Sequence, residues 1–92
     1  MATTCVHLLI SGEVQGVCYR ASARDEAERL GVVGWIRNLP DGDVEAEVEG
    51  PEALVADFVR WCWKGPPASL VRDIKVERSE PRDAFRRFGI LR

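Results

Sequence analysis

The chain has 92 residues, of which 46% are hydrophobic and 30% are charged. This balance is typical of one compact globular domain; it excludes a disordered tail or a coiled coil, and the length leaves no room for a second domain. Thirteen basic and fifteen acidic side chains give a net charge of −2, so no overall field draws the chain to nucleic acid or to an anionic membrane. We expect a single domain over residues 1–92 that binds any anion at a local site.

The three cysteines, Cys5, Cys18 and Cys62, form no C-x-x-C pair and cannot all be paired within one chain. We interpret them as reduced thiols of a cytoplasmic protein. The N-terminus lacks the basic segment of a signal peptide, and the apolar run Leu8–Ile10 is too short to span a membrane. Because the cysteines and the single His7 share no ligand spacing, we expect no metal and no cofactor.

Apolar residues alternate from Thr4 to Ser11 and predict a half-buried strand. A helix is predicted over 19–30, where apolar residues recur at helical spacing and Gly31 supplies a left-handed stop. The segments Val32–Leu39 and Val44–Glu49 read as two further strands, joined by a turn into a hairpin.

The second half of the chain repeats the change from helix to strand. Gly50–Glu52 opens a helix, with proline where its missing N–H costs nothing, and Lys64–Pro67 ends it. Val71–Arg78 alternates again, and a turn at Glu80–Asp83 leads to a last short strand over 85–91. The order is therefore βαββαβ, with a linker before the last strand.

Two split βαβ units place both helices on one face of an antiparallel sheet, because each helix returns the chain by a right-handed crossover. The sequence thus predicts a ferredoxin-like α/β sandwich. The other face of the sheet is expected to be solvated, and it carries Cys5, His7, Leu9, Glu45, Glu47 and Glu49.

The segment between the first strand and the first helix, residues 12–20, is a candidate anion site. Free backbone N–H groups and the helix dipole meet there, and Gly16 allows close approach of a ligand. Arg20 falls in the first helical turn, where its guanidinium can bind two oxygens of a phosphate or carboxylate. Spacing alone favours a plain turn with a solvated arginine over a phosphate site, since neither of the common phosphate-binding glycine motifs is present.

Two longer motifs carry a resemblance to a known family. Residues 10–20, ISGEVQGVCYR, resemble the first acylphosphatase signature, and residues 34–44, GWIRNLPDGDV, with Gly50, resemble the second. The likeness continues through Trp61, 64–66, 80–81 and 88–90, so it spans nearly the whole chain.

The acylphosphatase resemblance implies an enzyme that hydrolyses small acyl phosphates to a carboxylate and inorganic phosphate. It implies that Arg20 anchors the phosphate, that Asn38 orients the attacking water, and that a cradle binds the phosphate, formed by Gln15, Gly16, Val17, Cys18, Tyr19 and Arg20. Three residues depart from the family pattern without removing Arg20 or Asn38: Tyr19 stands where Phe is preferred, Ile36 where a smaller residue is, and Glu13 where many members are basic.

The residues fit this chemistry without the family name. The leaving group of an acyl phosphate is a carboxylate of low pKa, so the enzyme needs no general acid and mainly positions water and spreads charge. A phosphate monoester would require a metal, a protonated acid or a covalent nucleophile. Asn38 alone is ambiguous, because an asparagine before Leu39–Gly42 could instead shape the turn.

Other functions were weighed. Cys18 and Arg24 have the C-x₅-R spacing of cysteine-dependent phosphatases, but the residues between them include no glycine and favour a helix, which cannot curl around a phosphate. RNA-recognition modules share the element order, yet the third strand presents carboxylates instead of aromatic residues, so we expect no nucleic-acid partner. The alternative from another class is a non-catalytic ferredoxin-like domain that binds a ligand or a partner. We expect a monomer that does not bind membranes.

Overall fold

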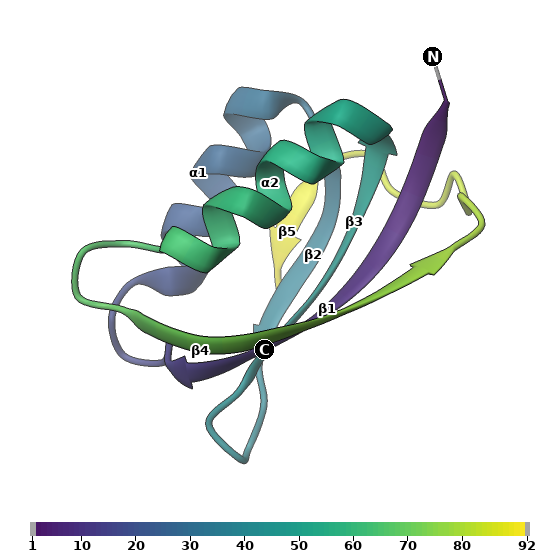
Figure 1. The fold of residues 1–92 in the computed structure, drawn as a ribbon. Coiled ribbons are helices and arrows are strands. Elements are labelled where there is room, and N and C mark those ends of the chain that lie inside the picture. The colour runs from purple at the N-terminus through teal and green to yellow at the C-terminus, as the bar shows by residue number, and fades with distance from the viewer. Residues whose placement is uncertain (1, 92) are drawn as a thin grey trace.

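The computed structural model describes residues 2–91, which form a five-stranded sheet and two helices (Figure 1). The elements follow in the order β1 (Thr3–Glu13), α1 (Tyr19–Leu30), β2 (Val33–Asn38), β3 (Val44–Pro51), α2 (Glu52–Lys64), β4 (Leu70–Ser79) and β5 (Phe88–Ile90). The predicted ferredoxin-like fold is confirmed. The first helix has the predicted bounds, whereas the last strand is shorter than the predicted 85–91.

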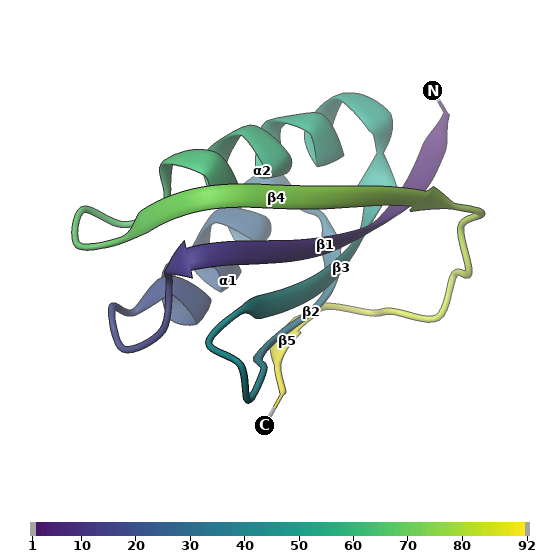
Figure 2. The same ribbon diagram turned by 60° about the horizontal axis from the view of Figure 1, so that its bottom comes forward.

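The strands lie in the order β4-β1-β3-β2-β5. Strands β1 to β4 pair antiparallel, as predicted, but β5 pairs parallel to β2, with Gly34 opposite Phe88 and Ile36 opposite Ile90. The sheet is therefore mixed. The parallel pair arises because β4 ends at the end of the sheet at which β2 begins, and the segment after β4 crosses there to the opposite edge of the sheet (Figure 2).

Both helices cover one face of the sheet, and the core fills the space between (Figure 1). Leu8, Ile10 and Phe58 are fully buried there, and so are Ala23 and Ala27 on α1. Because alanine is small, α1 can pack closely over β2 and β5. Neither helix in residues 2–91 is long and apolar enough to cross a membrane.

Helix α1 ends as its sequence predicts. Gly31 adopts a left-handed conformation with φ 81°, and its N–H donates to the carbonyls of Ala27 and Glu28. A glycine accepts this backbone angle without the steric cost of a Cβ atom, so it fixes the end of the helix.

The prediction that the other face is solvated is wrong for three residues. Cys5, Glu47 and Glu49 are only 0%, 7% and 6% exposed. Residues 80–87, which we call the strap, contact this face on their way from β4 to β5 (Figure 2). Alternation along β1 and β3 identified the residues of this face, but it could not show that another segment covers them.

The strap is bound by buried carboxylates. The two oxygens of Glu49 accept hydrogen bonds from the backbone N–H groups of Arg82 (2.9 Å) and Asp83 (3.1 Å). Glu47 pairs with the Arg82 guanidinium, which raises the pKa of that arginine, and also accepts from Cys5 Sγ at 3.4 Å. Charged hydrogen bonds of this kind offset the cost of removing both carboxylates from water.

We expect Glu49→Gln to lower the free energy of unfolding by about 1–2 kcal/mol, because a neutral amide offers one acceptor oxygen where the carboxylate offers two. Urea denaturation measures the difference. Glu28→Gln is the matched control, since Glu28 is exposed and forms no ion pair within residues 2–91. Equal effects of the two substitutions would contradict the role assigned to Glu49.

Candidate active site

The loop between β1 and α1 has two left-handed residues. Gly16 has φ 74° and Cys18 has φ 63°, with Val17 between them at negative φ. Alternation of this kind turns successive backbone N–H groups toward one side and forms a concave anion site. A Cβ added to Gly16 would meet no protein atom within 4 Å, so the space in front of this residue is open to a ligand.

Helix α1 begins at this loop without a side-chain cap. Cys18 is its N-cap residue but forms no capping hydrogen bond, and the first turn contains no acidic residue. The free N–H groups of the first turn therefore remain available to an anion, and the positive end of the helix dipole favours it. This geometry supports the anion site that the sequence predicts.

A cavity of about 390 Å³ lies against this helix end. Its lining residues come from the loop, α1, β2 and β5, namely Val14, Gly16, Cys18, Tyr19, Arg20, Ala21, Asn38 and Ile90. The fold thus brings together Arg20 and Asn38, which are 18 positions apart in the sequence. Of the predicted cradle residues, Gln15 and Val17 do not line the cavity, and neither does Glu13.

The side chain of Gln15 joins the loop to the β2–β3 turn. Its Nε2 donates to the backbone carbonyls of Leu39 (2.8 Å) and Asp43 (2.9 Å). Both amide hydrogens are used by these bonds, so the side chain cannot also donate to a phosphate. Gln15 instead fixes the loop beside the strand end that carries Asn38, a role that motif reading could not distinguish from phosphate contact.

Asn38 is the last residue of β2, and its side-chain oxygen is unusual. The Oδ1 atom is buried and has no hydrogen-bond partner among residues 2–91. An unpaired buried acceptor costs about 1–3 kcal/mol, so such atoms are rare outside functional sites. Asn38 lines the cavity that also holds Arg20, although its Oδ1 itself is shielded from solvent there.

Tyr19 anchors the start of α1. Its buried hydroxyl donates to the carbonyl of Cys62 at 2.5 Å, and its ring lies 5.7 Å from that of Trp61. In a continuing helix this carbonyl would accept from residue 66, but Pro66 has no N–H. The hydroxyl of Tyr19 therefore replaces a bond that α2 cannot form. Burial raises the pKa of Tyr19 above its ordinary value, so the group remains a donor in alkali.

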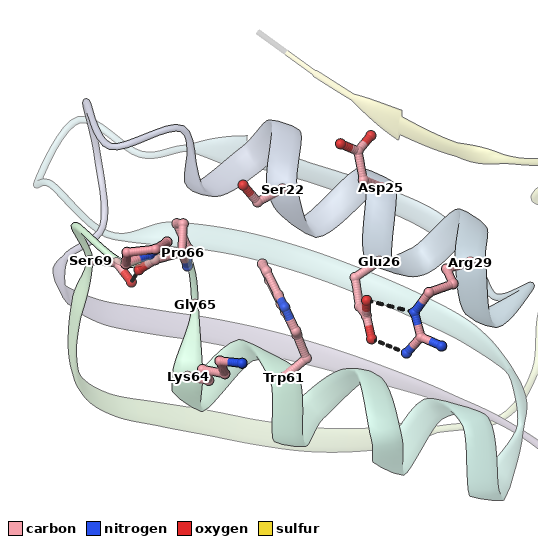
Figure 3. Close-up of a pocket in the computed structure, with 10 residues that line it drawn as sticks. Ser22, Asp25, Glu26, Arg29, Trp61, Lys64, Gly65, Pro66 and Ser69 are labelled. Carbon is pink, nitrogen blue, oxygen red and sulfur yellow. Dashed lines mark hydrogen bonds and ion pairs between the residues drawn. The ribbon is translucent and has the colours of Figure 1, made fainter.

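A larger cavity, of about 650 Å³, lies between the two helices (Figure 3). Trp61 stands between α1 and α2 there, and Glu26 accepts from Arg29 at 3.0 and 2.5 Å, which lowers the pKa of that carboxyl. The cationic guanidinium of Arg29 is thus already paired, and the helix start with its free N–H groups lies elsewhere. We assign the functional site to the smaller cavity because its groups suit one anion.

The cysteine-phosphatase alternative does not fit this geometry. Residues 19–24 all belong to α1, and Arg24 does not line the cavity with Cys18. Within residues 2–91, no three His, Cys, Asp or Glu side chains gather where they could hold a metal ion.

The acylphosphatase family model matches residues 6–90. The chain belongs to the acylphosphatase family. An acylphosphatase of Anaeromyxobacter sp. (strain Fw109-5) is 63% identical over 70 residues, covering 76% of this chain and 75% of the relative. An acylphosphatase of Trichormus variabilis is 51% identical over 87 residues, covering 95% and 85%. The crystal structure of acylphosphatase from Bacillus subtilis superposes with a TM-score of 0.94 at 36% identity, covering 97% of this chain and 99% of that one.

For this acylphosphatase we expect Tyr19→Phe to lower the free energy of unfolding by about 1–3 kcal/mol, because the buried Cys62 carbonyl loses its partner. The difference in the free energy of unfolding between the wild type and Tyr19→Phe should become smaller above about pH 10, the ordinary pKa of tyrosine. Above that pH unfolded tyrosine loses its proton while buried Tyr19 keeps it, so wild-type stability falls as pH rises.

Chemical denaturation at neutral and alkaline pH measures both effects. Tyr19 is the only tyrosine, so no other phenol contributes to the difference between the two proteins. A deficit that stays constant from neutral pH to well above pH 10 would contradict the assignment.

Proposed function

We propose that the chain hydrolyses the carboxyl–phosphate bond of small acyl phosphates by direct attack of water. Arg20 binds the phosphoryl group together with backbone N–H groups of the loop, and Asn38 orients the water. The observation that carries the proposal is that Asn38, whose buried Oδ1 has no partner among residues 2–91, lines one cavity with Arg20 and the uncapped start of α1.

The reaction needs little from the protein beyond placement and charge. Water attacks phosphorus, the phosphorus–oxygen bond to the acyl group breaks, and that oxygen leaves as a carboxylate. The proton released by the water ends on the phosphate product. Charge on the phosphoryl oxygens is held by a guanidinium and backbone N–H groups, which act without rearranging during the reaction.

Each proposed group has a distinct task. The guanidinium of Arg20 can bind two phosphoryl oxygens at once, which orients as well as neutralises the group. Asn38 accepts a hydrogen bond from the water and so holds an oxygen lone pair toward phosphorus. Backbone N–H groups of residues 15–20 complete the cradle, and in this proposal Gln15 acts through its backbone while its side chain holds the loop.

The proposal extends to a cytoplasmic monomer that acts as one domain over 1–92 and uses no cofactor. All three cysteines are free thiols, which suits a reducing compartment. Burial raises the pKa of Cys5 and raises that of Cys62 to about 12, so neither thiol is reactive at neutral pH. Size-exclusion chromatography with light scattering tests the monomer.

Asn38→Ala should lower kcat for acetyl phosphate by about 100-fold or more while the inhibition constant of inorganic phosphate changes little, because the side chain acts on water and not on the anion. Arg20→Gln should lower kcat and also raise that inhibition constant at least tenfold. Steady-state kinetics with phosphate as competitive inhibitor separate the two effects, with β-glycerophosphate as a phosphate monoester that should not be hydrolysed.

Near-normal turnover by folded Asn38→Ala would refute the role of Asn38. Equal hydrolysis of β-glycerophosphate and acetyl phosphate by the wild type would refute the proposed reaction class, because a site without a general acid has no means to expel an alkoxide well.

Cys18→Ser should retain activity within about threefold of wild type, because Cys18 contributes its backbone conformation and N–H to the cradle and its thiol is not a nucleophile. Activity and thermal unfolding measured side by side check this. A folded serine variant without activity would instead favour a covalent cysteine mechanism.

A further inference from the structure

Ile90 lines the cavity from β5, the strand that is shorter than the predicted 85–91. It ends β5, lies opposite Ile36 of β2, and is followed by Leu91, whose N–H donates to the Ile36 carbonyl at 2.8 Å. Opposed residues of paired strands point to the same face, and so do residues two apart on one strand. Ile90 therefore lies on the same helix-covered face of the sheet as Asn38.

The residues that line the cavity divide by chemistry. Arg20, Asn38 and the loop backbone are polar, whereas Val14, Ala21 and Ile90 are apolar. Val14 is only 1% exposed and offers almost no surface to a ligand, while Ala21 and Ile90 are half-buried. Ile90 is thus the largest apolar side chain available to a bound molecule here.

Ile90 also borders a second hollow, of about 510 Å³, between α1 and β5. It is the lining residue that this hollow shares with the cradle cavity, and the other residues there are Arg24, Asp25, Glu28, Arg87, Phe88 and Gly89. Two arginines face two carboxylates in this set, so the charges balance. The hollow therefore does not favour an acyl group that carries a net charge. The apolar side chain of Ile90, at the border between the two cavities, then determines which acyl groups can extend from the cradle cavity into this hollow.

We infer that Ile90 is the residue that determines acyl-group specificity, and that it favours substrates with a bulky apolar acyl group. The inference rests on the proposed function. In an in-line displacement the acyl oxygen departs on the side of phosphorus opposite the attacking water. Strand spacing places the Cα atoms of Ile90 and Asn38 about 8 Å apart, so the two residues border one cavity from neighbouring strands.

The test compares Ile90→Val and Ile90→Ala with wild type on acetyl phosphate and benzoyl phosphate. The ratio of kcat/KM for benzoyl to that for acetyl phosphate should fall about five- to tenfold in Ile90→Ala and less in Ile90→Val, because apolar contact with the ring is lost in steps. Leu91→Ala is the matched control, since Leu91 is 44% exposed and lines neither hollow. Circular dichroism and urea denaturation establish that each variant is folded.

A binding measurement keeps this inference separate from the proposed reaction. Calorimetry gives the dissociation constants of benzylphosphonate and methylphosphonate, which cannot be hydrolysed, and their ratio should move in Ile90→Ala as the kinetic ratio does. An unchanged ratio, or one that rises because truncation admits the ring more easily, overturns the role of Ile90. If the wild type does not hydrolyse acyl phosphates but Ile90→Ala changes the ratio of the two phosphonate dissociation constants, the proposed reaction is overturned while the role of Ile90 in binding the acyl group is supported.

Discussion

The position of the loop between β1 and α1 relative to Asn38 depends on the side-chain amide of Gln15. One residue, placed directly before Gly16, donates to two carbonyls of the turn that follows β2. The turn is closed by its own bonds, from Leu39 N–H to the Asp43 carbonyl and from Gly42 N–H to the Leu39 carbonyl. The amide therefore joins two elements that are each already fixed, and networks of this kind hold geometry more firmly than an isolated bond. The loop before α1 and the strand end that carries Asn38 are therefore held side by side by this amide.

A second constraint acts from the far side of the sheet. Glu47 and Glu49 would be costly to bury alone, but the strap supplies two backbone N–H groups and one guanidinium. The strap leads the chain to β5, which pairs with β2 and places Ile90 at the cavity. A pair of carboxylates on one face of the sheet thus contributes to a binding surface on the other. Neither contribution is visible in the local sequence around Ile90.

The sequence predicted what depends on local pattern. The helix over 19–30 and its end at Gly31 follow from apolar spacing and backbone preference. Of the site residues that the motifs predicted, five line the cavity: Gly16, Cys18, Tyr19, Arg20 and Asn38. The sequence did not predict that the strap covers Glu47 and Glu49. Alternation shows on which face of a sheet a residue lies, but it does not show which segment packs on that face. The sequence also grouped Gln15 with the cradle, since a glutamine beside a glycine-containing loop looks the same whether its amide binds a ligand or the next turn.

The site is built from features that weaken the fold. Cys18 has a left-handed backbone that costs a non-glycine residue about 1 kcal/mol, α1 lacks a side-chain cap, and Asn38 has a buried acceptor without a partner. Each is unfavourable in the protein by itself. In the proposed function a bound phosphate would accept from the free N–H groups of α1, whereas the steric cost at Cys18 remains and is offset elsewhere. The surroundings compensate with interactions that touch no ligand: the Tyr19 hydroxyl on α2, the Gln15 amide on the turn and the Glu49 carboxylate on the strap. Two of these supports, the Gln15 amide and the Glu49 carboxylate, lie outside the cavity, whereas Tyr19 lines it and bonds to α2 through its hydroxyl. Interactions of this kind let a fold hold groups that cost it stability at the places where function requires them.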